Sequence, residues 1–241
     1  MACVFGAAMV RGYSGFGFSL LAITPLALVL PPAAIIPPIF MMEVAASVSL
    51  LPSIWKDIHW RSLLPLSLGC LIGTPLGVWA LASVPAAPMQ VALAAAVLGA
   101  VALLWSGYAR KTMPSAPETI ATGGASGLLN GAFGIGGPPV VVFYFNSPAG
   151  ASITRASLIA FFIGTDTMGL GFLAGQGLVT AEGFYRFLMM LPALLVGQWL
   201  GTQSFKTSDP ARFRRWVLVI LGALALLTGA QGVLGLLLPA S

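Results

Sequence analysis

Hydrophobic residues follow one another in long runs along this chain, and only short polar stretches separate the runs. About 20 consecutive apolar residues are needed for a helix to cross a bilayer, and many of the runs approach that length. The pattern predicts ten apolar helical segments, at about residues 1–11, 16–30, 34–54, 62–83, 89–108, 119–133, 138–147, 152–175, 182–205 and 213–237. The predicted fold class is therefore an all-α polytopic membrane protein.

A glycine-rich break separates the segments at 119–133 and 138–147, where residues 134–139 read G-I-G-G-P-P. Non-helical backbone survives at membrane depth only where protein or a water-filled cavity surrounds it. Proline suits the first turn of a helix, so a short helix is expected to begin directly after the break. We expect a re-entrant or broken-helix hairpin whose break faces a cavity. The positive end of the second helix makes an anion the natural occupant.

The two halves of the chain resemble each other. Shifting the sequence by 119 residues lays Gly12, Gly15 and Gly17 on Gly131, Gly134 and Gly136. A shift of 123 residues lays Glu43 on Asp166. Glycines and carboxylates that coincide in order, at nearly one offset, indicate an internal duplication.

The duplication divides the chain into two predicted repeats and a connection. The N-terminal repeat, 1–108, contains a hairpin at 1–30 and helices at 34–54, 62–83 and 89–108. A cytoplasmic linker follows at 109–118. The C-terminal repeat, 119–241, contains a hairpin at 119–147 and helices at 152–175, 182–205 and 213–237.

The positions of the basic residues in the loops distinguish two possible membrane topologies. If each hairpin returns to its starting side, nine basic residues share one face and only Arg186 lies on the other; if each pair is a single broken span, the division is five against five. The positive-inside rule favours the first arrangement. It predicts inverted repeats in the cell (inner) membrane with both termini outside. The nine residues are Lys56, Arg61, Arg110, Lys111, Arg155, Lys206, Arg212, Arg214 and Arg215.

Composition narrows the possible functions. The chain is 58% hydrophobic and 7% charged, and its net charge of +5 is explained by membrane orientation, so nucleic acid is not an expected partner. One histidine and two cysteines, Cys3 and Cys70, show no metal-ligand or catalytic spacing. We therefore expect no enzyme activity, metal or cofactor. The expected partners are a small anion and the lipid bilayer, and a homo-oligomer is compatible with the sequence.

Arg11, Glu43 and Asp166 are ionisable residues that interrupt apolar stretches of the predicted membrane segments, where such residues are functional candidates. Arg11 precedes the first glycine break and is a candidate ligand for the anion; alternatively it extends to an interface or binds carbonyl groups of the break. Its counterpart in the second half, the neutral Asn130, is a second candidate ligand for the anion. Glu43 and Asp166 are proton-coupling candidates, unless they are structural partners of Arg11. Ser14 and Asn146 are further polar candidates for the cavity. Glycine spacings such as Gly69, Gly73 and Gly77 predict close helix packing.

The paired motifs at residues 12–25, G-Y-S-G-F-G-F-S-L-L-A-I-T-P, and 131–139, G-A-F-G-I-G-G-P-P, resemble the TauE/SafE sulfite-exporter family. Members of that family are membrane transporters of sulfite, sulfonates and other small organic anions. The resemblance implies a site at Ser14, Gly15, Gly17, Gly134, Gly136 and Gly137. Phe18 and Ser19 stand where many members carry further glycines.

The expected function is secondary transport. One repeat would move against the other around a midplane site and export a small sulfur-containing or organic anion by alternating access. Proton coupling through Glu43 or Asp166 stays open. A passive anion channel uses the same hydrogen-bond donors but needs a continuous wet path. A membrane-embedded sensor or scaffold would bind the anion without flux.

Overall fold

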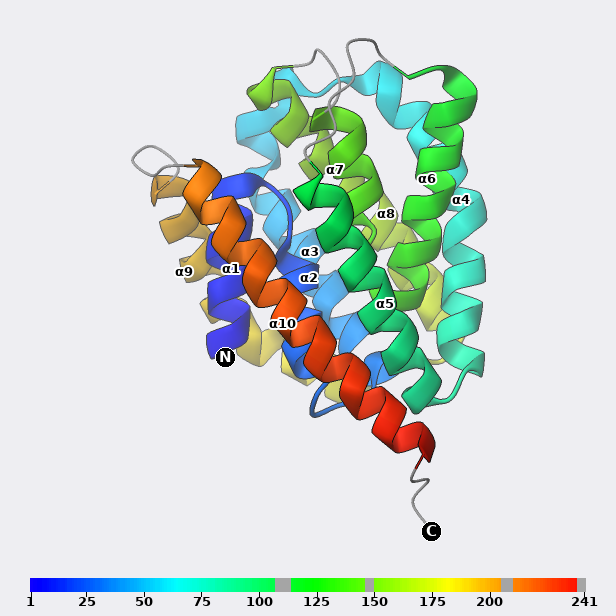
Figure 1. Ribbon diagram of the computed structural model, residues 1–241. Coiled ribbons are helices and arrows are strands. Elements are labelled where there is room, and N and C mark those ends of the chain that lie inside the picture. The colour runs from blue at the N-terminus through cyan, green and yellow to red at the C-terminus, as the bar shows by residue number, and fades with distance from the viewer. Residues whose placement is uncertain (107–113, 146–149, 205–209, 238–241) are drawn as a thin grey trace.

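The computed structural model describes residues 1–106, 114–145, 150–204 and 210–237 (Figure 1). Within these ranges all regular structure is helical, and the all-α prediction is confirmed. The elements are α1 (Ala2–Ser14), α2 (Phe18–Leu26), α3 (Pro32–Ile54), the 3-10 turn η1 (Trp55–Asp57), α4 (Trp60–Ser83), α5 (Ala86–Trp105), α6 (Ala116–Phe133), α7 (Gly137–Phe145), α8 (Ala151–Gly175), α9 (Ala181–Ser204) and α10 (Pro210–Leu237).

Among the residues that the structure describes, five helices are long and apolar enough to cross a membrane by length and composition, namely α3, α4, α5, α8 and α9. The chain is therefore a multi-pass membrane protein. In Figure 1, α1 begins at the end of the bundle where α10 finishes, whereas α6 begins at the opposite end. The helices α3 and α8 pack against each other in the middle of the bundle.

The start of α6 lies inside the predicted linker at 109–118. Ser115 is the N-cap, its backbone N–H donates to Glu118 Oε2 at 2.8 Å, and Pro117 occupies the first turn. Such a capping box satisfies N–H groups that the first helical turn leaves without intrahelical partners. It stabilises a helix start at Ala116, upstream of the apolar run from which the boundary was predicted.

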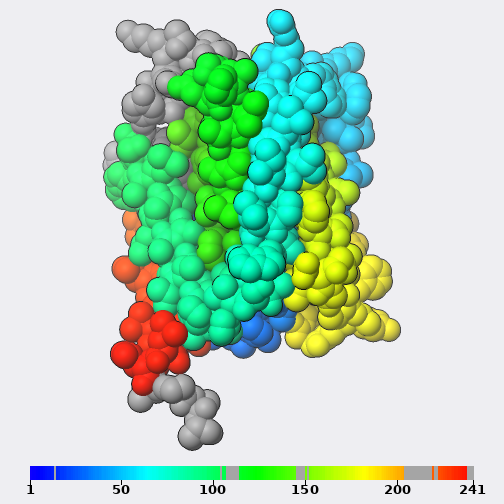
Figure 2. All heavy atoms as spheres, turned by 90° about the vertical axis from the view of Figure 1, so that its right-hand side faces the viewer, coloured from blue at the N-terminus to red at the C-terminus, as the bar shows by residue number. Residues whose placement is uncertain are grey.

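Two glycine rows bring α4 and α6 into close contact, and Figure 2 shows these helices side by side (cyan and green). A Cβ atom added to Gly73 would lie 2.2 Å from the Gly124 carbonyl oxygen. One added to Gly77 would lie 2.3 Å from the Leu128 carbonyl oxygen. The expectation of close packing along this row is confirmed, because no side chain larger than hydrogen fits there without displacing backbone.

The helices α1 and α9 form a second close pair. A Cβ atom at Gly12 would lie 2.2 Å from the Gln198 carbonyl oxygen, and one at Gly201 would lie 2.0 Å from the Met9 carbonyl oxygen. Further contacts join α2 to α10 and α7 to α5. The two short helices that follow the glycine breaks are thus each held between long helices near the centre of the bundle.

Candidate functional site

Two glycine breaks shape the centre of the molecule. The C-cap of α1 is Gly15, with φ +81°, and its N–H donates to the Arg11 carbonyl at 2.7 Å. The C-cap of α6 is Gly134, with φ +68°, and its N–H donates to the Asn130 carbonyl at 2.7 Å. Glycine adopts this left-handed conformation without the cost that a Cβ atom imposes. At each break the C-cap N–H therefore binds the carbonyl of a polar residue, Arg11 at the first and Asn130 at the second.

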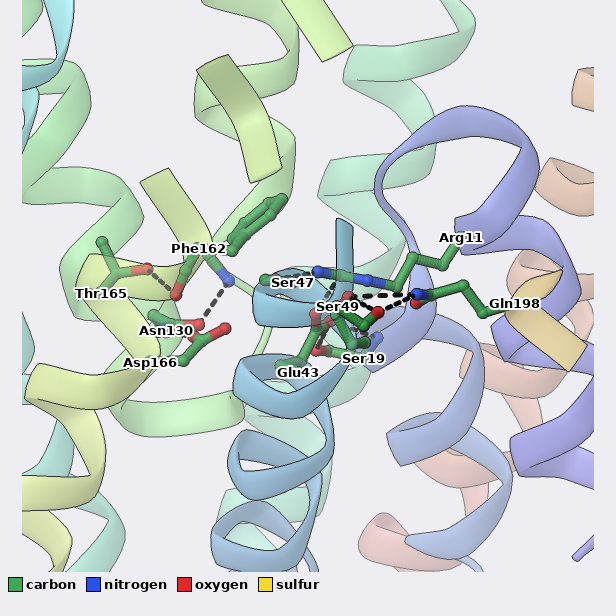
Figure 3. A network of polar contacts seen from close by, with 12 residues as sticks. Arg11, Ser19, Glu43, Ser47, Ser49, Asn130, Phe162, Thr165, Asp166 and Gln198 are labelled. Atoms are coloured by element: carbon green, nitrogen blue, oxygen red, sulfur yellow. Dashed lines mark hydrogen bonds and ion pairs between the residues drawn. The ribbon is translucent and has the colours of Figure 1, made fainter. Parts of the chain in front are cut away.

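At the first break, Arg11 is fully buried and forms an ion pair with Glu43 of α3 (Figure 3). Its guanidinium also donates to the Ser47 hydroxyl, and its Cζ lies 5.8 Å from the centroid of the Phe162 ring. The positive charge that we expected to meet an anion directly is thus already balanced by a carboxylate. Of the two alternatives weighed for Glu43, the geometry fits a partner of Arg11.

Glu43 also holds the start of α2. Its Oε1 accepts a hydrogen bond of 2.6 Å from the Ser19 hydroxyl and a longer one of 3.3 Å from the Ser19 backbone N–H. A carboxylate at this position interacts favourably with the positive end of the helix dipole. Sequence reasoning did not place Ser19 in the site, although its position in the first turn after a break was a usable signal.

Asn130 and Ser126 make the polar contacts at the second break. Asn130 Oδ1 accepts from the Gly136 N–H at 3.2 Å, while Asn130 Nδ2 donates to Asp166 Oδ1 at 2.8 Å (Figure 3). The Ser126 hydroxyl donates to the Gly136 carbonyl. The Gly136 N–H is thus bound by Asn130 and is not free to face an anion in this conformation. Asp166 Oδ2 is buried and has no hydrogen-bond partner among the described residues.

Both breaks border one small cavity of about 10 Å³, which is room for about one water molecule. Its walls come from both hairpins and from α3 and α8. The lining residues are Phe16, Gly17, Ser19, Leu20, Glu43, Asn130, Gly134, Ile135, Gly136, Gly137, Phe162 and Asp166. The two hairpins, far apart in the sequence, therefore meet at a common polar space.

Several predicted residues lie elsewhere. Arg11 and Gly15 are not among the residues that line the cavity, and Ser14 ends α1, where its side chain is not described. Asn146 lies outside the described residues. Arg155 was predicted only as a loop cation, yet its Nη2 donates to the Gly12 carbonyl at 3.2 Å. It thereby supports the carbonyl end of α1 next to the first break.

No cluster of three or more His, Cys, Asp or Glu side chains able to hold a metal occurs within the part of the chain that the structure describes. The polar groups at the cavity are two carboxylates, one amide, one hydroxyl and the starts of two short helices. Such groups bind and orient a small solute. Their arrangement, buried in the middle of a multi-pass helical bundle, is typical of a membrane transporter.

Comparison with known proteins identifies the family. The family model described as "Sulfite exporter TauE/SafE" matches residues 1–228, and the chain belongs to this family. A curated relative from Cupriavidus necator, named "Probable sulfite/organosulfonate exporter TauE", is 28% identical over 224 residues, which cover 89% of this chain and 86% of the relative. No solved structure matches the chain. The resemblance inferred from the two glycine motifs is thus confirmed, and the protein is a transporter and not an enzyme.

Proposed function

We propose that this protein exports a small anion of the sulfite or sulfonate class, or a related organic anion, by alternating access. The family and the name of the C. necator relative support the substrate class. The observation that carries the mechanism is the shared cavity, because residues of both hairpins line it. Movement of one hairpin against the other would open that cavity to one side of the membrane at a time.

The size of the cavity favours a carrier over a channel. A channel needs a continuous wet path with weak binding at several points. At about 10 Å³ the space is smaller than a sulfite ion, which has four heavy atoms. A closed, undersized site between two hairpins fits a state that opens before the anion enters.

We further propose that residues 1–108 and 119–241 are inverted repeats. The helices α1 and α6 begin at opposite ends of the bundle (Figure 1), and each packs against the fourth helix of the other half, α9 or α4. At the equivalent positions, Arg11 pairs with Glu43 and Asn130 with Asp166. Together with the distribution of basic residues, this supports an inner-membrane protein with both termini outside.

Of the two candidate carboxyl groups, Asp166 is the better one for proton coupling. Glu43 is balanced by Arg11, and a coupling group must exchange its proton during transport. Among the described residues, Asp166 accepts a hydrogen bond from the neutral Asn130 amide alone, through one oxygen, and its second oxygen is buried at the cavity. We therefore assign the coupling proton to Asp166.

Flux from liposomes tests the proposed function. Purified protein is reconstituted into liposomes loaded with radiolabelled sulfite, and efflux is compared with that from protein-free liposomes. We expect protein-dependent efflux that saturates with sulfite concentration and is inhibited by methanesulfonate. Binding of sulfite to the purified protein without any flux would contradict transport and would support a sensor or scaffold.

A further inference from the structure

Asp166 is the one cavity-lining carboxylate that has no ion-pair partner among the described residues. It is 2% exposed, and its Oδ2 has no hydrogen-bond partner there. Its Oδ1 accepts from Asn130, as described above. This geometry suits a protonated carboxyl group, with one oxygen accepting and the other available to donate its proton to a bound anion.

The charged and titratable groups around Asp166 come from several helices. From α1 and α3 come Arg11 and Glu43, which cancel each other as an ion pair. On α4, the Cys70 thiol donates to the Gly123 carbonyl. Arg155, eleven residues before Asp166 on α8, donates to the Gly12 carbonyl at the end of α1. Arg155 is not among the residues that line the cavity, and the Arg11–Glu43 pair adds no net charge to it.

The starts of α2 and α7 provide positive potential. Gly17 and Gly137, at these starts, both line the cavity. Each helix N-terminus is equivalent to roughly half a positive elementary charge. The C-termini of α1 and α6 end at the same two breaks with partial charges of the opposite sign, so the helix ends together add little net charge. An ionised Asp166 would therefore leave about one unbalanced negative charge at the cavity, and protonation of Asp166 removes it.

We infer that the site takes anions carrying a single negative charge, and that such an anion binds together with one proton on Asp166. This inference rests on the proposed function and specifies its substrate class: alkylsulfonates and hydrogen sulfite are accepted, whereas sulfate and other compact dianions are rejected. A second negative charge would have no compensating charge in a buried space, where Coulomb repulsion is strong.

The inference also defines the transport step. One monoanion and one proton cross together, so the loaded site carries no additional net charge through the membrane. Export then follows the combined concentration gradients of the anion and the proton, and the membrane potential has no direct effect on this step.

Binding measurements on the purified full-length protein test this assignment. Methanesulfonate is a monoanion and sulfate a dianion throughout mildly acidic to mildly alkaline buffers, so neither probe changes its own charge. We expect methanesulfonate to bind at least about a hundredfold more tightly than sulfate. On the alkaline side its affinity should fall about tenfold for each pH unit. Titration in buffers of different ionisation enthalpy should show uptake of one proton per anion under those conditions.

Two variants sharpen the test. In Asp166→Asn the pH dependence and the proton uptake should both disappear, whereas Glu182→Gln, which changes an exposed carboxylate on α9, should keep the wild-type pH dependence. If Asp166→Asn does not fold, proton uptake by the wild-type protein alone decides. Equal affinity for sulfate and methanesulfonate, pH-independent binding by the wild type, or no methanesulfonate binding at any pH would overturn the inference. Sulfite flux together with equal binding of monoanions and dianions would refute this inference and leave the proposed function intact. Selective binding of the monoanion without any flux would refute the proposed function and leave this inference intact.

Discussion

Replacing Arg11 by glutamine is expected to lower the free energy of unfolding by about 3–5 kcal/mol and to abolish transport. The reason is that Glu43, only 3% exposed, would be left as a buried carboxylate without its cation. The Ser19 hydroxyl donates to the same carboxylate, so the start of α2 would then lie next to an unbalanced negative charge. The change therefore affects both the stability of the bundle and the geometry of the first break.

Unfolding in mixed micelles measures this effect through a double-mutant cycle. Arg11→Gln, Glu43→Gln and the combined variant are compared with the wild type. The combined variant should be less destabilised than the sum of the two single changes, because it removes both charges of the pair. Arg186→Gln is a suitable control. Arg186 forms an ion pair with the exposed Glu182 one turn earlier on α9, and this pair should contribute less than about 1 kcal/mol to the free energy of unfolding. A single Arg11→Gln variant as stable as the wild type would refute the structural role of the ion pair.

Alanine at Gly73 is expected to disrupt the α4–α6 pair and to destabilise the protein by at least about 1–3 kcal/mol. The added Cβ would lie 2.2 Å from the Gly124 carbonyl oxygen and 2.8 Å from the Leu128 backbone nitrogen. Both neighbours are backbone atoms, so the helices themselves would have to separate. Because α6 leads into the second break, transport should fall together with stability.

The chain offers a matched control for this substitution at Gly99 in α5. A Cβ atom there meets nothing within 4 Å, so Gly99→Ala adds a methyl group to a membrane helix without a clash. The thermal unfolding temperature and the yield of monodisperse protein should both be strongly reduced for Gly73→Ala. Both should be close to the wild-type values for Gly99→Ala. Equal behaviour of the two variants would show that the glycine row does not determine the close approach of the helices.

The glycine pattern was enough to predict much of the architecture. Glycine has a specific role at Gly15 and Gly134, where the backbone turns through positive φ, and the two positions correspond at a single sequence offset. The same offset aligned Arg11 with Asn130, and both were found in the last turn before a break. Local backbone chemistry of this kind is readable from a single sequence because it depends on neighbouring residues.

The partners of the charged groups were harder to predict. Nothing in the spacing of Arg11 and Glu43, 32 positions apart, distinguishes an ion pair from two separate ligands of an anion. Asn130 was a candidate for the anion, but it accepts from the Gly136 N–H in the structure. Such contacts depend on how α3 and α8 pack across both hairpins, and a single sequence does not specify side-chain direction between distant helices.

Counterflow in proteoliposomes tests the alternating-access proposal most directly. Liposomes containing the purified protein are loaded with excess unlabelled sulfite and diluted into a trace of radiolabelled sulfite. A carrier with a single alternating site predicts that label accumulates transiently inside above its outside concentration, because entry of label is coupled to exit of unlabelled anion. Label that only equilibrates, without any such overshoot, would contradict alternating access and would indicate a passive channel.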